Sequence, residues 1–390
     1  MYDFDTLIPR RGTGAVKWDA RPPFDADTED MIPLWVADMD FKAAPFITEA
    51  LRRRVEHGVF GYVTVPDSYY GAVCRWFSGR HGWSIEKDWI LYTTGVVPAL
   101  SVVIKALSGP GKKVILQSPV YNCFFSSTRN SGSEILDVPL VYHDGTYSFD
   151  FEGLERACAD PDATLLLLCN PHNPAGRVWT RAELERVGDI ARRHGVTVVS
   201  DEIHCEIVMP GIHYTPFASV SPECQEICVT LCSPSKSFNI AGLHIANIVT
   251  PNAEWRRLID RVINVYELCD VNPFGVVALE AAYSPEGAEW LEELNQYIYD
   301  NYLLLKQVLC NYPVCKLEGT YLPWVDISSL GVPSEKVEEI LLRDYKVWVN
   351  AGTMYGTEGF IRINLATPRA LLAEGLKRVA RGLAALSDKH

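Results

Sequence analysis

Three apolar runs in the middle of the chain each lead into a polar residue, and this pattern constrains the fold more than any other feature of the sequence. The runs are residues 164–169, 196–200 and 228–231, and they lead to Asn173 in the loop NPHNPAG, to Asp201, and to Lys236 in SPSK, respectively. Residues 181–195 between the first two runs have helical periodicity, and alternating strands and helices are typical of a parallel sheet. Ligands bind at the carboxyl edge of such sheets. Asn173, Asp201 and Lys236 are therefore expected to meet at one site.

The regions on either side of these runs suggest two domains. Residues 93–99 are typical of a strand, a glycine turn and a helix start, and residues 114–117 of a further strand. The last hundred residues instead combine long amphipathic helices with short strands near residues 325–327 and 359–364. A chain of 390 residues accommodates two or three domains. We expect an α/β fold with a large domain over residues 45–280, whose mostly parallel sheet is sandwiched by helices, and a smaller α+β domain formed by residues 1–44 and 281–390.

Composition and charge exclude several other classes of protein. The hydrophobic fraction of 48% and the charged fraction of 22% are ordinary for a globular protein. The formal net charge of −13 provides no basic footprint for nucleic acid. Apolar runs such as residues 165–169 are too short to cross a bilayer, and residues 1–5 lack the basic and apolar regions of a secretory signal. We expect a cytoplasmic protein that binds neither nucleic acid nor membrane.

The eleven cysteines favour free thiols over a disulfide framework or a metal site. Many lie inside apolar runs, where cysteine behaves as a small hydrophobe. Cys224, Cys228 and Cys232 recur every four residues, but a zinc site needs a CxxC-type knuckle and a fourth ligand. We interpret residues 226–231 as a buried strand and expect no metal.

Lys236 is a candidate for covalent chemistry. It follows a buried strand and lies between small hydroxyl residues in SPSKSFN. Burial lowers the pKa of an amine, and a neutral amine forms a Schiff base with an aldehyde. A loop lysine with its ammonium group in water fits the position alone equally well. The hydroxyls of Ser233 and Ser235, which are able to bind a phosphate, favour the reactive lysine.

Three further residues or turns are expected at the same edge of the sheet. Asp201 ends a buried strand, and a buried carboxylate there requires a cation; a protonated ring nitrogen of a bound cofactor is one such cation, and an internal arginine is the alternative. The glycine turn at Gly95 and Val96 opens a helix whose free N–H groups would bind phosphate. Tyr121 lies on a loop where it would stack on a planar ring.

These motifs, in this order, resemble a fold-type I pyridoxal-phosphate enzyme of the aminotransferase superfamily. The narrower resemblance is to the MalY/PatB-type C–S lyases, which are similar to cystathionine β-lyase, and it covers essentially the whole chain. The segments that carry it are RRGT (10–13), KWD (17–19), WVADMDF (35–41), GY (61–62), PDSYY (66–70), RHGW (80–83), TGVVPA (94–99), NPHNPAG (170–176), SDEIH (200–204), SPSKSFNIAGL (233–243) and GFIR (359–362). WVADMDF and PDSYY are highly specific, whereas the NP-x-NP-x-G motif is shared by the wider superfamily.

The resemblance implies a role for each matching residue, with pyridoxal 5′-phosphate as cofactor. Lys236 would be the Schiff-base lysine and proton carrier, Asp201 the partner of the pyridine nitrogen, and Asn173 the donor to the ring oxygen. Tyr121 would stack on the ring and act in catalysis. The phosphate would be held by Gly95, Val96, Ser233 and Ser235, with Tyr62 contributed by the second subunit of a homodimer. Arg362 would bind the substrate α-carboxylate, a geometry that a guanidinium suits.

Two positions depart from the broad superfamily pattern. His204 stands where many aminotransferases carry a tyrosine, and a histidine there is typical of the lyase-like group; it is predicted beside the cofactor, with a satisfied core histidine as the alternative. His244 stands where many carry an arginine that binds phosphate, so phosphate binding is expected to be weaker.

Three hypotheses about function remain at this stage. The first is a β-eliminating C–S lyase that acts on cystathionine, cysteine or a cysteine S-conjugate. The second is an aminotransferase that uses a 2-oxo acid acceptor. The third is a regulatory protein that retains the cofactor site and acts through a protein partner, which the sequence does not identify. The full-length motif match favours the lyase, and the intact Lys236, Asp201, Asn173 and Arg362 set argues against a purely binding role.

Overall fold

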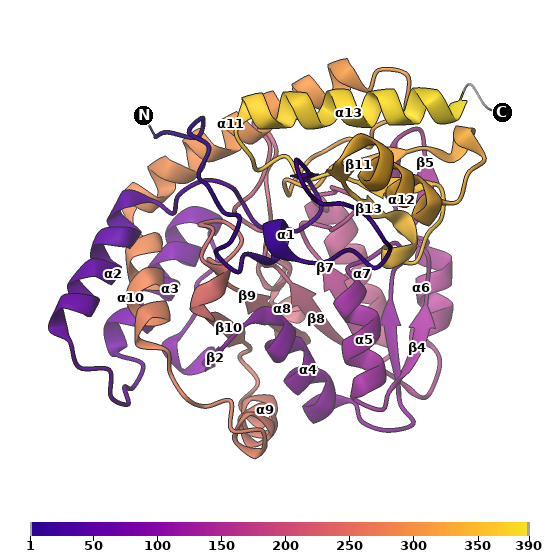
Figure 1. Ribbon diagram of the computed structural model, residues 1–390. Helices are drawn as coiled ribbons and strands as arrows, with labels where there is room; N and C mark the ends of the chain where they lie inside the picture. Colours follow the sequence, from indigo (N-terminus) through magenta and orange to yellow (C-terminus); the bar gives the residue numbers. More distant parts are fainter. Residues whose placement is uncertain (1, 388–390) are drawn as a thin grey trace.

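A computed structural model of the chain describes residues 2–387 and is built around a seven-stranded sheet (Figure 1). The strands pair in the order β2-β10-β9-β8-β7-β3-β4. The pairs among β9, β8, β7, β3 and β4 are parallel, and β10 runs antiparallel to both of its neighbours. The prediction of a mostly parallel α/β sheet is therefore confirmed. The strands are β2 (Ile90–Thr93), β3 (Lys113–Leu116), β4 (Glu134–Asp137), β7 (Ala163–Cys169), β8 (Thr197–Asp201), β9 (Cys228–Cys232) and β10 (Ala246–Val249).

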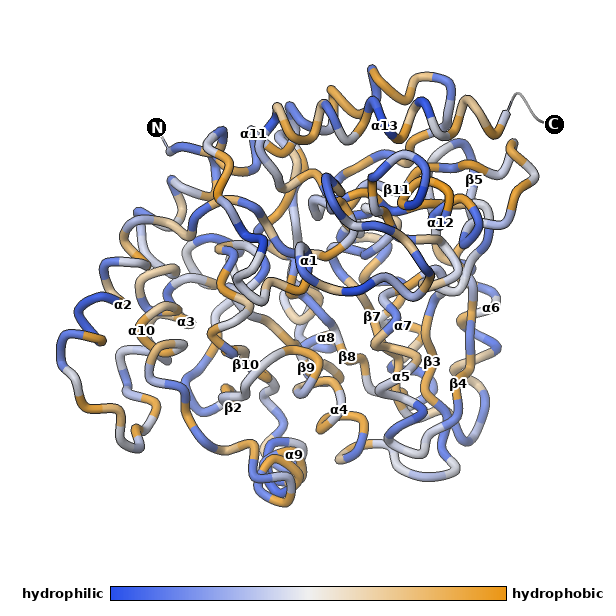
Figure 2. The backbone as a smooth tube through the Cα atoms, in the orientation of Figure 1, coloured by the Kyte–Doolittle hydropathy of each residue, from blue (hydrophilic) through white to orange (hydrophobic). Residues whose placement is uncertain are grey.

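Both faces of the sheet are buried because its strands are apolar at consecutive positions. In β7, Leu165 and Leu167 belong to one buried cluster, and Leu166 and Leu168 belong to another. Figure 2 shows hydrophobic colour along β3 and β7, as expected for parallel strands covered on both sides. The first cluster includes side chains of α4 (Val96–Leu107), α5 (Asn122–Asn130) and α9 (Ala253–Val265). The second includes side chains of α2 (Pro45–His57), α3 (Asp67–His81), α6 (Phe151–Cys158), α7 (Arg181–Arg193), α8 (Pro222–Glu226), α10 (Pro273–Ala282) and α11 (Pro285–Val308).

The helix predicted at residues 181–195 begins where expected and ends two residues earlier, as α7. A capping box formed by Thr180 and Glu183 fixes its start. Gly195 has a φ of 69°, a left-handed conformation that suits glycine just beyond a helix. The chain then enters β8, which delivers Asp201 to the carboxyl edge of the sheet.

The two ends of the chain pack against each other. In Figure 1 the indigo N-terminal segment, with α1 (Val16–Asp19), crosses the molecule beside the orange and yellow C-terminal elements. β1 (Ile32–Pro33) pairs in parallel with β12 (Val347–Trp348). This contact supports the grouping of both termini, but the division into residues 45–280 and the remainder stays a prediction; residues 1 and 388–390 lie outside the described part. The other elements here are β11 (Trp324–Asp326), α12 (Ser334–Tyr345), β13 (Asn350–Ala351), β14 (Phe360–Arg362) and α13 (Arg369–Ser387), and a β5 (Val141–His143) and β6 (Thr146–Ser148) hairpin completes the strands.

The cysteines of the chain form no disulfides among the described residues. All eleven cysteines are free thiols. Cys224 lies in α8, and Cys228 and Cys232 lie on the buried strand β9; the strand predicted at residues 226–231 thus begins two residues later and ends one residue later than expected. Among residues 2–387, no helix is long and apolar enough to cross a membrane.

Candidate cofactor and substrate site

A cavity of about 290 Å³ opens at the carboxyl ends of the parallel strands. It brings together eight of the residues that the sequence singles out. These are Gly95, Val96, Tyr121, Asn173, Asp201, His204, Ser235 and Lys236. Ser233, Arg362 and Tyr62 do not line it. The cavity therefore lies at the carboxyl edge of the sheet, where the sequence predicts the site.

Lys236 lines the cavity, and its side chain is half-buried. Its Nζ donates a hydrogen bond to the backbone carbonyl of Ala37 at 2.7 Å. Desolvation of the amine lowers the pKa of Lys236, as does the nearby Arg362 guanidinium, while Asp38 acts in the opposite direction. An amine with a lowered pKa is suited to form a Schiff base and to carry a proton.

The loop that presents Lys236 is fixed by its neighbouring serines. The Ser233 hydroxyl donates to the carbonyl of Ile245 at 2.5 Å and accepts from the amide of Ser235 at 3.0 Å. Ser233 is thus buried and internally bonded, whereas Ser235 lines the cavity. Of the two predicted phosphate hydroxyls, Ser235 is the one that faces the cavity.

Asp201 and His204 form the next part of the wall. Burial raises the pKa of Asp201 from 3.8 to about 6, although the amide of Ile203 donates to its carboxylate at 3.1 Å. Burial lowers the pKa of His204 to about 3, so its imidazole is neutral. Its Nδ1 has no hydrogen-bond partner among the described residues. Among residues 2–387 Asp201 therefore forms no ion pair, although the positive charge of nearby Lys236 lowers its pKa, and His204 is not a fully satisfied core histidine.

The amino end of α4 offers a place for an anion. Gly95 is its N-cap and provides no side-chain cap, so the first N–H groups of the helix remain available. A Cβ at Gly95 would lie 3.3 Å from Cδ of Pro98 and would crowd this turn. Ser235 and the exposed His244 line the same cavity.

Arg362 lies behind Asn173, on β14 of the C-terminal sheet. One guanidinium nitrogen donates to Oδ1 of Asn173 at 3.1 Å, and the other donates to the carbonyl of Trp35 at 2.7 Å. Its Nε has no partner within residues 2–387 although the side chain is buried. Such a guanidinium retains capacity for a carboxylate.

Tyr121 and Tyr62 differ sharply in their surroundings. Tyr121 lines the cavity, and burial, with the neighbouring Cys123 thiol, raises the pKa of its phenol well above 10. Tyr62 lies between α2 and α3 with 97% of its surface exposed. It has no contact with the cavity of its own subunit.

Some residues of the site could not be recognised from the sequence. Ala37 contributes a backbone carbonyl, and Cys169 and Ile203 contribute apolar wall. Ala37 lies in the WVADMDF motif, which marked the segment without indicating a contact with Lys236. The predicted lysine and its acceptor are 199 residues apart in the chain.

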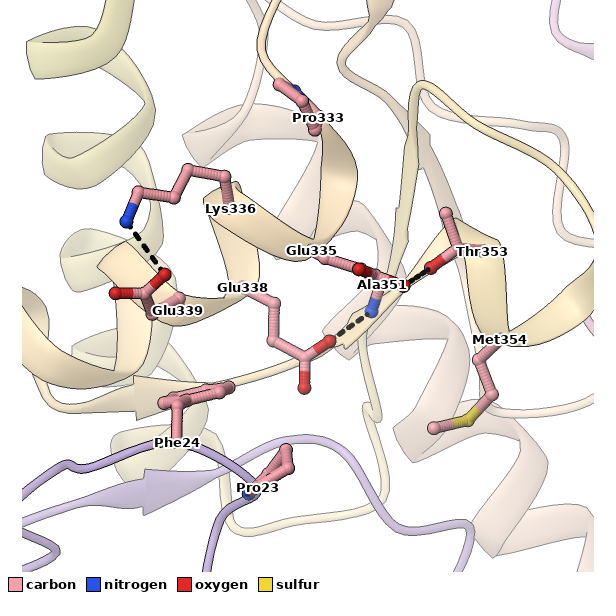
Figure 3. A pocket seen from close by; sticks show the side chains of 10 residues that line it. All are labelled: Pro23, Phe24, Pro333, Glu335, Lys336, Glu338, Glu339, Ala351, Thr353 and Met354. Atoms are coloured by element: carbon pink, nitrogen blue, oxygen red, sulfur yellow. Dashed lines mark hydrogen bonds and ion pairs between the residues drawn. The ribbon is translucent and has the colours of Figure 1, made fainter.

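A second, larger cavity of about 720 Å³ lies between α12 and residues 23–24 (Figure 3). Its acidic side chains are already engaged: Glu338 accepts from the amide of Ala351 at 2.8 Å, and Glu335 accepts from the Thr353 hydroxyl at 2.9 Å. It contains none of the predicted site residues. The smaller cavity is therefore the candidate site, because the predicted site residues line it and do not line the larger one.

The fold and the site define a pyridoxal-phosphate enzyme of fold type I. The class I and II aminotransferase family model matches residues 29–379. The chain is 42% identical to the cystathionine beta-lyase PatB of Bacillus subtilis over 98% of its length and 100% of the relative. It is 32% identical to the protein MalY of Escherichia coli, over 99% of this chain and 100% of the relative. The chain belongs to the class I and II aminotransferase family and, within it, to the MalY/PatB-type group.

A solved relative agrees with this assignment. The structure of cystalysin from Treponema denticola, which contains a pyridoxal 5′-phosphate cofactor, matches with a TM-score of 0.95 and 34% identity, covering 99% of this chain and 100% of that one. The residues of the present cavity fit that cofactor. Asp201 has no ion-pair partner among the described residues, the first N–H groups of α4 have no side-chain cap, and the amine of Lys236 lines the same cavity. The predicted family and cofactor are thus confirmed, whereas the individual residue roles stay predictions.

Proposed function

We propose that the protein is a pyridoxal-phosphate-dependent carbon–sulfur β-lyase that eliminates a thiol from cystathionine or a related cysteine thioether. The observation that carries this proposal is the convergence of Lys236, Asp201, Asn173 and Arg362 at one buried site, in a chain 42% identical to a cystathionine beta-lyase. One thioether and one water give one thiol, one pyruvate and one ammonia. No electrons enter or leave, so no second substrate is needed.

The residues that would hold the cofactor line the cavity or contact a lining residue. Lys236 would provide the Schiff-base amine, and the buried Asp201 carboxylate would pair with the protonated ring nitrogen. Oδ1 of Asn173 is engaged by Arg362, which leaves the amide nitrogen of Asn173 able to donate to the ring oxygen. Tyr121 would stack on the ring. The α4 turn at Gly95 and Val96 and the hydroxyl of Ser235 would bind the phosphate, and Ser233 would act by orienting Ser235.

When bound, the cofactor supplies an electron sink for the negative charge that develops at the substrate α-carbon. Arg362 binds the substrate α-carboxylate through its free Nε and fixes the orientation of the Cα–H bond. Lys236 removes that proton as a general base, which its lowered pKa favours. The same amine then gives the proton to the departing sulfur. Asp201 stays ionised and stabilises the charge on the ring.

Elimination is favoured over transamination by the leaving group. A thiolate on the β-carbon departs readily once negative charge develops at Cα, whereas transamination requires protonation elsewhere on the cofactor. His204 lines the cavity as a neutral imidazole, so it adds no cationic acid there. The leaving group therefore favours loss of sulfur.

The test is product stoichiometry with cystathionine and no 2-oxo acid. We expect thiol, pyruvate and ammonia in equal amounts over many turnovers. If turnover stops after one equivalent and resumes when a 2-oxo acid is added, the protein is an aminotransferase. Free cysteine is expected to be the poorer substrate, because a thioether arm fills more of the cavity.

We further propose that the active form is a homodimer in which Tyr62 completes the site of the other subunit. Tyr62 is 97% exposed, and Val55, Val59 and Phe60 beside it are also more than half exposed. Such an apolar group at the end of α2 and on the loop that follows it is typical of a surface that a second chain covers. Mixing Tyr62→Phe and Lys236→Ala protomers should restore activity, because each heterodimer then contains one intact site. A monomer in sedimentation at assay concentration would contradict this proposal.

We place the protein in the cytoplasm. Its eleven cysteines are free thiols, and several, including Cys205, Cys228 and Cys232, are fully buried. Free thiols persist in reducing compartments. Fractionation of cells that express the tagged chain tests this location.

A further inference from the structure

Residues 34–39, here called the strap, contribute Ala37 to the cavity wall, and every one of their carbonyls accepts a hydrogen bond. The amide of Asn364 donates to the carbonyl of Leu34 at 2.9 Å, and the side chain of Asn364 donates to the carbonyls of Val36 and Asp38. The carbonyl of Met39 accepts from Arg10 and from Asn239, both at 3.0 Å. An irregular segment with all six carbonyls satisfied is held in one conformation.

Two of the donors to the strap are reactive groups of the proposed site. Lys236 donates to the carbonyl of Ala37 at 2.7 Å, and Arg362 donates to the carbonyl of Trp35 at 2.7 Å. The hydroxyl of Tyr321 also donates to Ala37, at 3.1 Å. The position of the strap therefore sets the direction in which Nζ of Lys236 points.

A buried ion cluster of the N-terminal segment fixes the far end of the strap. Asp40 is 1% exposed and accepts from Lys17 at 2.7 Å, from the indole of Trp18 at 2.8 Å and from Arg10 at 2.8 Å. Arg10 also pairs with Asp38 at 2.7 Å. Two cations and two carboxylates balance within the cluster, so the loss of one member leaves a buried charge unpaired.

The cluster gives a physical meaning to three motifs that the reaction itself does not use. Arg10 belongs to RRGT, Lys17 and Trp18 to KWD, and Asp38 and Asp40 to WVADMDF. Asp19 accepts from the amides of Gly12 and Gly14 and so folds the first motif back toward the second. The three motifs thus form one cluster that holds residues 38–40, directly after Ala37.

We infer that Arg10, Lys17 and Asp40 are positioning residues for the reaction, because they fix the Ala37 carbonyl and through it Nζ of Lys236. This inference rests on the proposed function, in which Lys236 carries a proton from Cα to sulfur. A lysine side chain has four rotatable bonds, and a free amine without a fixed acceptor samples many positions. Misplacement of a reacting group by about 1 Å costs on the order of 100-fold in rate.

Two adjacent arginines supply a matched pair of variants. Arg10 contacts Asp38, Asp40 and the carbonyl of Met39. Arg11 contacts the carbonyl of Met31 at 2.7 Å and lies over the ring of Trp18, with no hydrogen bond to the strap. Arg10→Met and Arg11→Met therefore make the same chemical change in the same segment, and they differ in whether the strap loses a partner.

The first measurement is amide hydrogen exchange of the strap in the apoprotein, read by mass spectrometry on peptides that cover residues 34–41. We expect exchange at least about threefold faster in Arg10→Met than in wild type or Arg11→Met. The second measurement is steady-state kinetics of the holoenzyme with cystathionine. We expect kcat to fall about 10- to 100-fold in Arg10→Met with KM changed less than about threefold, since the Trp35 end of the strap keeps its own contacts. Arg10→Lys, which retains one ion pair, should recover part of kcat.

Equal exchange in the two methionine variants would overturn the inference, and so would faster exchange with unchanged kcat. Asp38→Asn, a half-buried isosteric change, replaces Arg10→Met if that variant does not fold, and the same two outcomes apply to it. A wild-type protein that turns over only with a 2-oxo acid would refute the lyase and leave the strap comparison to be made on that turnover. Failure of the strap inference is thus distinguishable from failure of the proposed function.

Discussion

Replacing Asp201 by asparagine should stabilise the apoprotein while it inactivates the holoenzyme. Burial raises the pKa of this carboxyl from 3.8 to about 6 in the protein alone. At about 1.4 kcal/mol per pH unit, the difference means that the ionised carboxylate costs the folded apoprotein about 3 kcal/mol. An amide carries no charge and avoids this cost. In the holoenzyme the same amide cannot hold the ring nitrogen protonated, and turnover should fall about 100- to 1,000-fold.

The sign of the pH dependence follows from the raised pKa. The folded state favours the protonated carboxyl, so its contribution to stability is fully present below pH 3.8 and is lost as the pH rises through 6. The advantage of Asp201→Asn over wild type should therefore be near zero at pH 4, grow between pH 4 and 6, and approach about 3 kcal/mol at pH 8. Urea unfolding of both apoproteins at pH 4 and pH 8 measures this difference.

Glu202→Gln is the matched control. Glu202 is buried next to Asp201, and burial raises its pKa to about 7, but it does not line the cavity. Its carboxylate accepts from Ser200 and the amide of Phe217 at Oε1 and from Tyr214 at Oε2; in glutamine the amide oxygen can still accept from the first two, and the NH2 group can donate to the Tyr214 hydroxyl oxygen. This variant should share the pH-dependent gain in stability and keep turnover within about threefold. If Asp201→Asn shows no gain at pH 8, or keeps near wild-type turnover, Asp201 is a structural residue and the reasoning is wrong.

Three further predictions concern Lys236, Arg362 and Glu206. Lys236→Ala should bind the cofactor without a Schiff base, so that borohydride reduction leaves no cofactor attached to the chain by mass spectrometry; an attached cofactor would place the linkage elsewhere. Arg362→Lys should lower kcat/KM about 100-fold, mainly through KM, because one ammonium cannot contact Asn173, Trp35 and a carboxylate together; an unchanged KM would show that the carboxylate binds elsewhere. His81 and Arg80 hold the pKa of buried Glu206 at about 2, so Glu206 contributes about 3 kcal/mol that is present above pH 4.5 and lost as the pH falls toward 2. Glu206→Gln should therefore unfold at lower urea concentration than wild type at pH 7, the difference should shrink to less than about 1 kcal/mol at pH 2.5, and a pH-independent difference would contradict this account.

Strand ends could be predicted from the sequence because their signal is local. The runs that precede Asn173, Asp201 and Lys236 are apolar at consecutive positions, and the structure forms them as β7, β8 and β9. Since parallel strands share a carboxyl edge, their following residues meet without any further information. The fold and the position of the cavity were predictable for this reason.

Contacts between side chains and distant backbone could not be predicted in this way. The acceptor for Lys236 is a carbonyl of Ala37, a residue whose side chain has no functional group. Ser233 and Ser235 have the same local context in the sequence, yet one is bonded internally and the other faces the cavity. These outcomes depend on how β10 and the strap pack around the loop, which no local pattern encodes.

The pairing of β1 with β12 also determines when the site is completed during synthesis. Ile32 lies opposite Val347, so the N-terminal segment acquires its pairing partner only after nearly the whole chain has left the ribosome. Before that point all seven strands of the central sheet, which end at Val249, have already been synthesised together with Asp201 and Lys236. The Ala37 carbonyl is not yet fixed against Lys236. In a nascent chain arrested before residue 346, the strap would therefore keep its contacts to Arg10, Lys17 and Asn239 but lack those to Arg362 and Asn364. Capture of the cofactor in its final environment is consequently one of the last events in the maturation of this protein.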